Sequence, residues 1–148
     1  MSLSEVKTIM YKVQRVSFTD ETQALVEELL PIHGPLLFHQ SGGCCDGSAP
    51  MCYPRDEFKV GSRDVYLGEV AGQPFFISHD QWEYWSHTHL IIDVVPGRGG
   101  MFSVEGPTGK RFLTRSRLYS EDEGELMKSD QLILGGDQSI EGVRSTVD

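Results

Sequence analysis

The feature that most constrains the fold is a shortage of helices, because one stretch alone has the spacing of a long amphipathic helix. It begins after Thr19, whose side chain can cap the first turn, and should end at His33-Gly34-Pro35. Its apolar residues fall on one helical face: Leu25, Val26, Leu29 and Leu30. The rest of the fold must therefore be built largely from strands.

Strand-like runs surround this helix. We expect strands at about 11–18, 36–40, 65–70, 74–78, 87–95, 101–105 and 110–118, and a short helix at 79–86. The turn residues at 71–73 and 106–109 predict two hairpins, and a doubly wound parallel sheet would need more crossover helices. The sequence predicts an α+β fold, an antiparallel-rich β half-barrel or sandwich with one N-terminal amphipathic helix and one short helix.

Size and charge limit the classes of function. A chain of 148 residues fits one globular domain, which we place at 1–120, followed by an acidic, polar C-terminal tail at 121–148. The net charge of −9, with 22 acidic and 13 basic residues, argues against nucleic acid as a partner. No apolar run approaches the roughly 20 residues that cross a bilayer, so we expect no membrane association.

All three cysteines lie in one glycine-rich segment without periodicity, from Ser41 to about Pro54. An odd number of clustered cysteines is not a disulfide framework, which favours a reducing, cytoplasmic location. Thiolates bind soft or borderline metals, so we expect Cys44, Cys45 and Cys52 as ligands of iron, zinc or an iron–sulfur cluster. Gly42 and Gly43 would let backbone amides approach that cofactor.

Two other interpretations of the cysteines remain open. They can be packed as small apolar residues beside a tight turn. One of them can also be a redox-active thiol, which needs a nearby cation to lower its pKa. Arg55 is the nearest candidate for that cation, whereas Asp46 has the opposite effect.

The histidines supply further candidate ligands. His39 lies just before the cysteine segment and can face it. His87 and His89 are two apart in an expected strand, so both side chains and Asp93 share one face. This spacing resembles part of the first metal motif of the cupins, although Gln81 replaces its glycine and no histidine follows His89.

The order of segments over about 14–118 resembles the iron–sulfur A-type carrier, or HesB-like, fold. The resemblance is carried by 16–21 with the helix that follows, by Gly42-Gly43-Cys44, and by the runs 76–78, 90–93 and 101–104. Those carriers end with a Cys-Gly-Cys pair, whereas 113–118 contain no cysteine here. The resemblance therefore implies a cluster ligand at Cys44 alone.

A second resemblance covers a shorter string. His39-Gln40-Ser41 followed by Gly42-Gly43-Cys44-Cys45-Asp46-Gly47-Ser48 is similar to a small bacterial family of unknown function. Its members are often encoded beside aldehyde dehydrogenases, which implies an accessory role for such an enzyme.

These observations favour a metal or iron–sulfur handling accessory protein that serves an acceptor or client protein, with an aldehyde dehydrogenase as the implied client. In this hypothesis His39, His87 or His89 completes the ligand shell of the cysteines. One alternative is a partner-binding accessory protein without metal, and a weaker one is a cupin-like enzyme using His87 and His89. Exposed strand edges also make a homodimer a reasonable expectation.

Overall fold

The computed structural model describes residues 11–41, 48–98, 103–137, 140, 142–143 and 146–147. The helices are α1 (Asp20–His33), α2 (His79–Trp85) and α3 (Glu121–Met127). The strands are β1 (Val16–Phe18), β2 (Leu36–Gln40), β3 (Met51–Pro54), β4 (Lys59–Val60), β5 (Val65–Val70), β6 (Gln73–Ile77), β7 (Thr88–Pro96), β8 (Lys110–Leu118), β9 (Ile133–Leu134) and β10 (Thr146–Val147). Short 3-10 turns cover Arg55–Glu57 and Gly106–Thr108.

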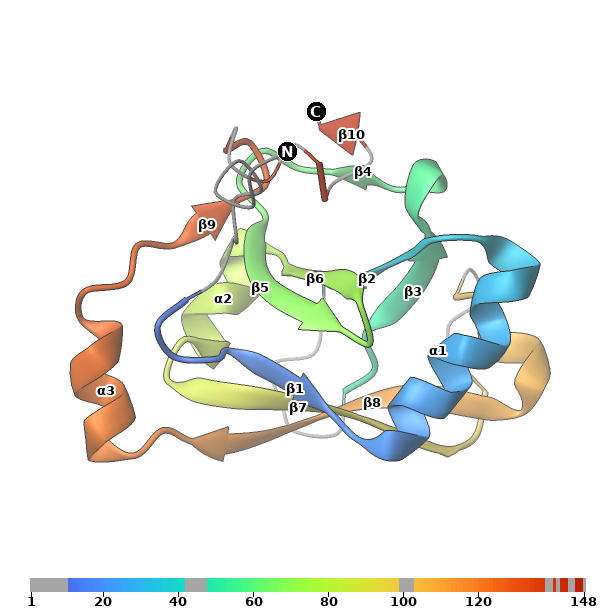
Figure 1. Cartoon of the computed structure of the whole chain (residues 1–148), viewed down its shortest axis with the longest axis horizontal. Helices are drawn as coiled ribbons and strands as arrows, with labels where there is room; N and C mark the ends of the chain where they lie inside the picture. The colour runs from blue at the N-terminus through green and yellow to red at the C-terminus, as the bar shows by residue number, and fades with distance from the viewer. Residues whose placement is uncertain are drawn as a thin grey trace, which may run out of the picture.

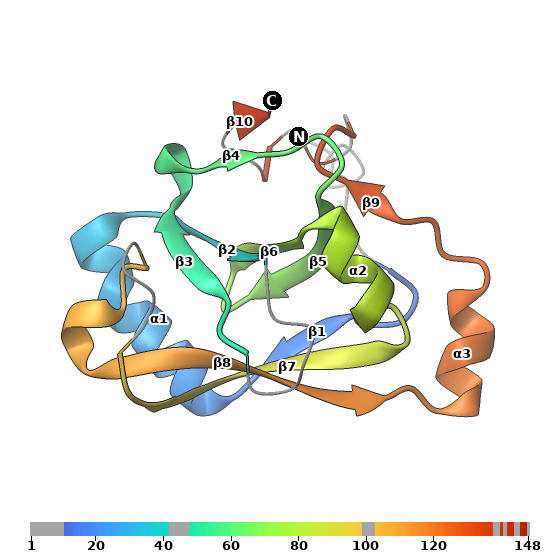
Figure 2. The ribbon, with the colours of Figure 1, turned by 180° about the vertical axis from the view of Figure 1, so that it is seen from behind.

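Two sheets pack against each other around the main core. The five-stranded sheet has the order β3-β2-β6-β5-β9, and the three-stranded sheet β1-β7-β8 lies beneath it in Figure 1. Figure 2 shows α2 in front of the sheets and α1 at the opposite side. The core takes apolar side chains from both sheets, from α1 and from Trp85 of α2. The expected α+β fold is confirmed, without a closed barrel in the described residues.

Strand pairing is more mixed than the expected antiparallel pattern. β1 pairs with β7, β2 with β6 and β10 with β4 in parallel, whereas β2–β3, β5–β6, β5–β9 and β7–β8 are antiparallel. The parallel pairs join strands that are distant in sequence, so no local turn signal reveals them.

Helix α1 begins and ends at the expected residues. The Thr19 hydroxyl accepts a hydrogen bond from the amide of Thr22 at 3.3 Å and so caps the helix. The Thr22 hydroxyl donates to the carbonyl oxygen of Ile92 at 2.7 Å, which joins the first turn of α1 to β7. At the other end of the helix, the amide of Gly34 donates a hydrogen bond to the carbonyl oxygen of Leu30 at 2.8 Å.

The hairpin of β5 and β6 is also confirmed. Its turn residues Ala71 and Gly72 both have positive φ, 52° and 82°, as the two-residue turn of type I′ requires. Helix α2 follows directly, with the Ser78 hydroxyl accepting from the amide of Gln81 at 3.4 Å. The expected inward position of the two tryptophans is met by Trp85, which is 3% exposed, whereas Trp82 is half-buried.

The first strand is shorter than its sequence predicts. We expected a strand over 11–18, but only Val16–Phe18 pair with β7. Before it, the Asp130 carboxylate accepts the amide of Lys12 at 3.0 and 3.1 Å and the amide of Val13 at 3.4 Å. The side chain of Asp130, distant in the sequence, thus takes the place of a partner strand. Arg15 forms a buried ion pair with the same carboxylate at 3.2 Å.

Two predictions about the middle of the chain were wrong. The segment to Pro54 is not all loop, because its last four residues form β3 beside β2, with Cys52 opposite Phe38. The described part of the expected strand at 101–105 is not a strand: residues 103–105 lead into the 3-10 turn at Gly106–Thr108, and β8 pairs with β7 along its whole length. Residues 101 and 102 lie outside the described residues.

The segment 121–148, expected as a polar tail, adds elements to the fold. Ser120 caps α3 with a capping box, and β9 pairs with β5 at the edge of the five-stranded sheet. Ile140 is fully buried in a second apolar cluster, on the outer face of that sheet, with Leu37, Val60, Tyr66 and Phe76. This segment therefore contributes to the packing of the domain.

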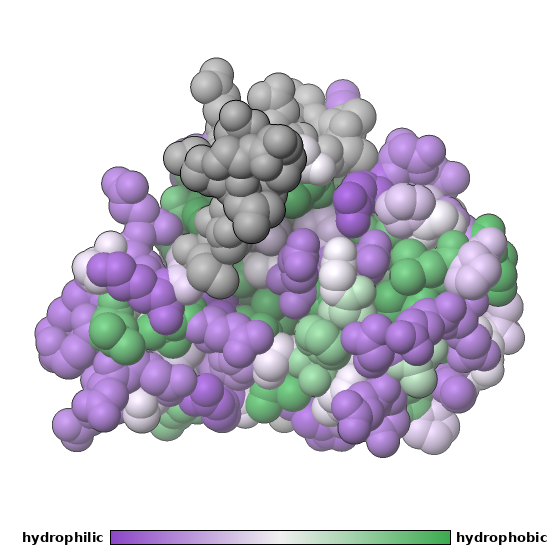
Figure 3. All heavy atoms as spheres, viewed as in Figure 1, coloured by the Kyte–Doolittle hydropathy of each residue, from purple (hydrophilic) through white to green (hydrophobic). Residues whose placement is uncertain are grey.

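Hydrophilic residues cover most of the described surface on the face seen in Figure 3, with hydrophobic residues scattered between them. Among the described helices, none has both the length and the apolarity to cross a membrane.

Gly135 should be intolerant of a side chain. Its amide donates to the Asp64 carbonyl oxygen at 2.7 Å, and a Cβ there would lie 2.2 Å from the Gly61 carbonyl oxygen. We expect Gly135→Ala to lower the free energy of unfolding by about 1–3 kcal/mol in urea denaturation, the usual range for overpacking. Gly124→Ala is the control, since a Cβ inside α3 meets no atom within 4 Å. Equal stability of the two variants would contradict this close approach.

Candidate functional site

The base of the cysteine-bearing loop is organised by β2, all five of whose residues are buried. At the end of this strand the Gln40 side chain is fully buried. Its Oε1 accepts from the Thr114 hydroxyl at 2.9 Å, and its Nε2 donates to Ser48 Oγ at 3.2 Å. The Thr114 amide also donates to the Ser48 carbonyl oxygen at 2.7 Å. Residues 40 and 48 are thereby held side by side, and β8 is joined to β2.

Beside this base lies a buried polar group around Cys52. The Cys52 amide donates to Ser103 Oγ at 2.8 Å, and the Cys52 carbonyl oxygen accepts the amide of Val104 at 2.9 Å. The Ser103 hydroxyl makes a short hydrogen bond to Oε1 of Glu105. Glu105 is fully buried, and its Oε2 has no hydrogen-bond partner among the described residues. Among the described residues, no cationic side chain forms an ion pair with this buried carboxyl group.

Burial governs the protonation of both groups. It raises the pKa of the Cys52 thiol well above its ordinary value, and the nearby Glu105 carboxylate adds to that rise. It also raises the pKa of Glu105, which the Ser103 hydroxyl and the amides of Glu105 and Phe112 offset only in part. In the metal-free chain Cys52 is therefore a neutral thiol and not a reactive thiolate, and no described residue supports the redox interpretation.

The predicted ligands of the cysteine loop are only partly described. Gly42, Gly43, Cys44 and Cys45 lie outside the described residues. Cys52 is fully buried on β3 and belongs to the main core, so it also fulfils the structural role of a small apolar residue. In the described part of the chain, no group of three or more potential ligands (His, Cys, Asp or Glu) comes together.

The structure does not bring the histidines to Cys52. His39 lies one residue after Phe38, which faces Cys52, so strand alternation directs it to the other face of the sheet. There its Nε2 lies 3.0 Å from Asp64 Oδ2. The expectation that His39 faces the cysteines is therefore wrong for Cys52, because the two residues are out of phase along β2 and β3.

His87 and His89 also differ from their expected placement. His87 is exposed in the turn before β7, while His89 is buried within the strand. Asp93 lies four residues further along, about 13 Å away at the usual rise of a strand. Its carboxylate is bonded to Thr19 at 3.0 Å and to Arg115 at 2.8 Å. The three residues therefore do not form a cupin-like cluster.

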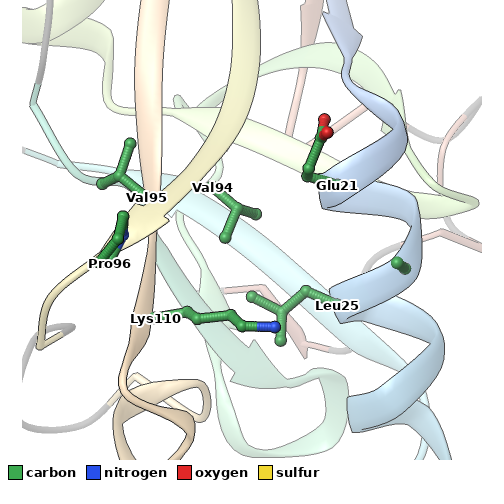
Figure 4. Close-up of a pocket in the computed structure, with 7 residues that line it drawn as sticks. Glu21, Leu25, Val94, Val95, Pro96 and Lys110 are labelled. Carbon is green, nitrogen blue, oxygen red and sulfur yellow. The ribbon is translucent and has the colours of Figure 1, made fainter.

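A separate groove lies between α1 and the end of the β7–β8 pair (Figure 4). It has a volume of about 270 Å³ and is mainly apolar, with a carboxylate from Glu21 and an ammonium group from Lys110 on opposite walls. Its remaining lining residues are Ala24, Leu25, Val94, Val95 and Pro96. No residue predicted as a ligand lines this groove.

The residues at the loop base gave little signal in the sequence. Gln40, Ser103, Glu105 and Thr114 are polar residues in or beside strands, and nothing in their spacing marks them as buried. Glu105 stands directly before a Gly-Pro turn, where a carboxylate is normally exposed. A buried acid at that place becomes visible only when Ser103 and Val104 are seen to hydrogen-bond to Cys52 of β3.

Comparison with known proteins identifies the family. The model of a domain of unknown function, DUF779, matches residues 25–118. The chain belongs to the DUF779 family. No curated protein and no solved structure matches it significantly. The DUF779 region includes Cys52, Glu105, Gln40 and Thr114, while β1, α3 and β9 lie outside it.

His89 of this DUF779 protein should titrate below the ordinary range of histidine. Burial lowers its pKa, and the hydrogen bond to the Gln14 carbonyl opposes this only in part. In the pH range between the folded and unfolded pKa values, the unfolded chain binds more protons, so the free energy of unfolding falls as pH decreases from about 6.5. We expect His89→Gln to make this dependence shallower in urea denaturation at pH 7 to 5. An unchanged slope would contradict the buried neutral state.

Proposed function

We propose that this DUF779 protein binds iron, zinc or an iron–sulfur cluster through Cys44, Cys45 and Cys52 and acts as an accessory, metal-handling protein. The observation that carries the proposal is the buried Glu105 carboxylate near Cys52, whose Oε2 has no partner among the described residues. Buried charges in proteins are normally paired or bound to a metal. A cation would supply the partner that this carboxylate lacks.

Chain length supports convergence of the three thiols. The bond from Gln40 to Ser48 holds the ends of the loop together, at 3.2 Å between Nε2 and Oγ. Cys45 is three residues from Ser48, a span of at most about 11 Å in an extended chain. Cys52 lies four residues beyond Ser48. These chain lengths are compatible with three thiols that bind a common ion.

The protonation of Cys52 is consistent with a metal ligand. Burial and the Glu105 carboxylate raise the pKa of the thiol, so the free thiolate is disfavoured at neutral pH. A bound metal would displace this proton, and its positive charge would balance the negative charges of the thiolate and the carboxylate. We therefore expect proton release on metal binding, with greater affinity at higher pH.

Metal content tests the proposal directly. The full chain is purified anaerobically and examined by elemental analysis and visible absorption, before and after reconstitution with iron, sulfide or zinc. We expect Cys52→Ser and Glu105→Gln each to weaken metal binding at least about 10-fold, as loss of a supporting group commonly does. Glu28→Gln, at an exposed position of α1, is the control. A wild-type protein that stays metal-free and colourless after reconstitution would overturn the proposal.

Glu105→Gln also separates metal binding from folding. In the metal-free protein the substitution replaces a buried carboxyl group, whose ionised form burial disfavours, by a neutral amide of similar size, so the free energy of unfolding at pH 7 should not fall. Loss of metal together with retained stability supports Glu105 as a metal-binding group. Unchanged metal affinity in this variant would assign it a purely structural role.

We further propose an aldehyde dehydrogenase as the client, a step that rests on the resemblance of the segment 39–48 to a bacterial family encoded beside such enzymes. Co-expression with an aldehyde dehydrogenase from the same source should yield a complex that Cys44→Ser weakens. If the two proteins purify separately, and the dehydrogenase is equally active with and without co-expression of this protein, the proposal that the dehydrogenase is its client is wrong.

A further inference from the structure

A serine and a histidine meet on the outer face of the three-stranded sheet, away from the cysteine loop. Ser17 of β1 places its Oγ 2.8 Å from Nε2 of His89 on β7. The other ring nitrogen, Nδ1, lies 2.9 Å from the carbonyl oxygen of Gln14. Because a carbonyl oxygen only accepts, Nδ1 must carry the proton, and Nε2 of the neutral ring is left to accept the Ser17 hydroxyl. The three groups stand in the order nucleophile, base and orienting acceptor.

The environment keeps the imidazole neutral. His89 is 4% exposed, and this burial lowers its pKa more than the Gln14 hydrogen bond raises it. Of the charged groups nearby, Arg117 lowers the pKa further and Glu123 raises it. His89 can therefore accept a proton at neutral pH, as a general base must.

A buried tyrosine packs next to this pair. The ring of Tyr119 lies edge-on against the His89 ring, with centroids 6.1 Å apart. Its Oη is buried and has no hydrogen-bond partner among the described residues. Burial raises the pKa of Tyr119 to about 12, so the O–H proton is retained. Ser17 itself is only half-buried, so part of this residue is open to solvent.

We propose that Ser17 is a nucleophilic serine that accepts an acyl group from small activated esters, with His89 as its general base. The Ser17 Oγ attacks the ester carbonyl carbon while its proton passes to His89 Nε2. The new Oγ–C bond forms, the bond to the leaving alcohol breaks, and the alcohol takes the proton from His89. Water then releases the acid by the reverse proton path.

This inference is independent of the metal proposal, because it uses no residue of the cysteine loop. A structural role alone would require only that Ser17 and His89 satisfy each other's hydrogen bonds between β1 and β7. Such a pair would show no enhanced reactivity at the serine oxygen. Covalent reactivity at Ser17, and its dependence on His89, is therefore the property that distinguishes the two roles.

A fluorophosphonate probe tests the nucleophile in the full, metal-free chain. Attack of Ser17 forms an Oγ–P bond and releases fluoride, and the adduct is located by intact mass and peptide mapping. We expect a single label on Ser17, absent in Ser17→Ala and unchanged in the control Ser62→Ala, which removes an exposed serine. Absence of label, or label at other serines alone, would overturn the proposal.

The base is tested by rate. His89→Gln should slow labelling at least about 100-fold, the lower range for loss of a general base. The wild-type rate should fall only at a pH below the ordinary pKa of histidine, about 6.5, since the pKa of His89 is lowered. Thermal melting checks that the variant is folded; should it fail to fold, the pH profile of the wild-type protein decides. A labelling rate that is insensitive to pH, or that is unchanged in a folded His89→Gln variant, would overturn the proposal.

Discussion

The structure depends on the burial of β2 on both of its faces. This strand runs between β3 and β6, with the main core on one side and the second apolar cluster on the other. On the main-core side, Phe38 packs edge-on against Phe112 of β8, with ring centroids 4.9 Å apart. Two residues further along each strand, the Gln40 side chain of β2 accepts a hydrogen bond from the Thr114 hydroxyl of β8. The contact between the two sheets thus ends in a hydrogen bond at Gln40, the residue that also binds Ser48 at the far end of the cysteine-bearing segment.

Strand alternation along β2 also places the candidate functional groups on opposite faces of the five-stranded sheet. Phe38 and Gln40 face the side that holds Cys52, whereas Leu37 and His39 face the other cluster. A one-residue change of register would exchange these sets. The buried carboxylate and thiol are therefore kept apart from the His39–Asp64 pair by a layer of backbone. The Ser17–His89 pair lies on a third surface, the outer face of the smaller sheet.

Local signals in the sequence predicted the elements that local chemistry determines. The cap at Thr19, the turn at Ala71-Gly72 and the helix after Ser78 each depend on residues within a few positions, and each lies where expected. The elements that were missed depend on distant partners. Strand β3 exists because β2 is beside it, and Lys12 and Val13 are fixed by Asp130. The sequence pointed to Cys52 as a candidate ligand but not to Glu105, whose buried position depends on the hydrogen bonds of Ser103 and Val104 to Cys52.

The edge of the five-stranded sheet shows how far the structural unit extends. The region that matches DUF779 ends at residue 118, but β9 pairs with β5 at 133–134 and covers the edge of that strand at Val65 and Tyr66. An uncovered strand edge exposes amides and carbonyls on which another chain can assemble. In this chain β9, within the C-terminal fifth of the sequence, shields part of the edge of β5 from pairing with another strand.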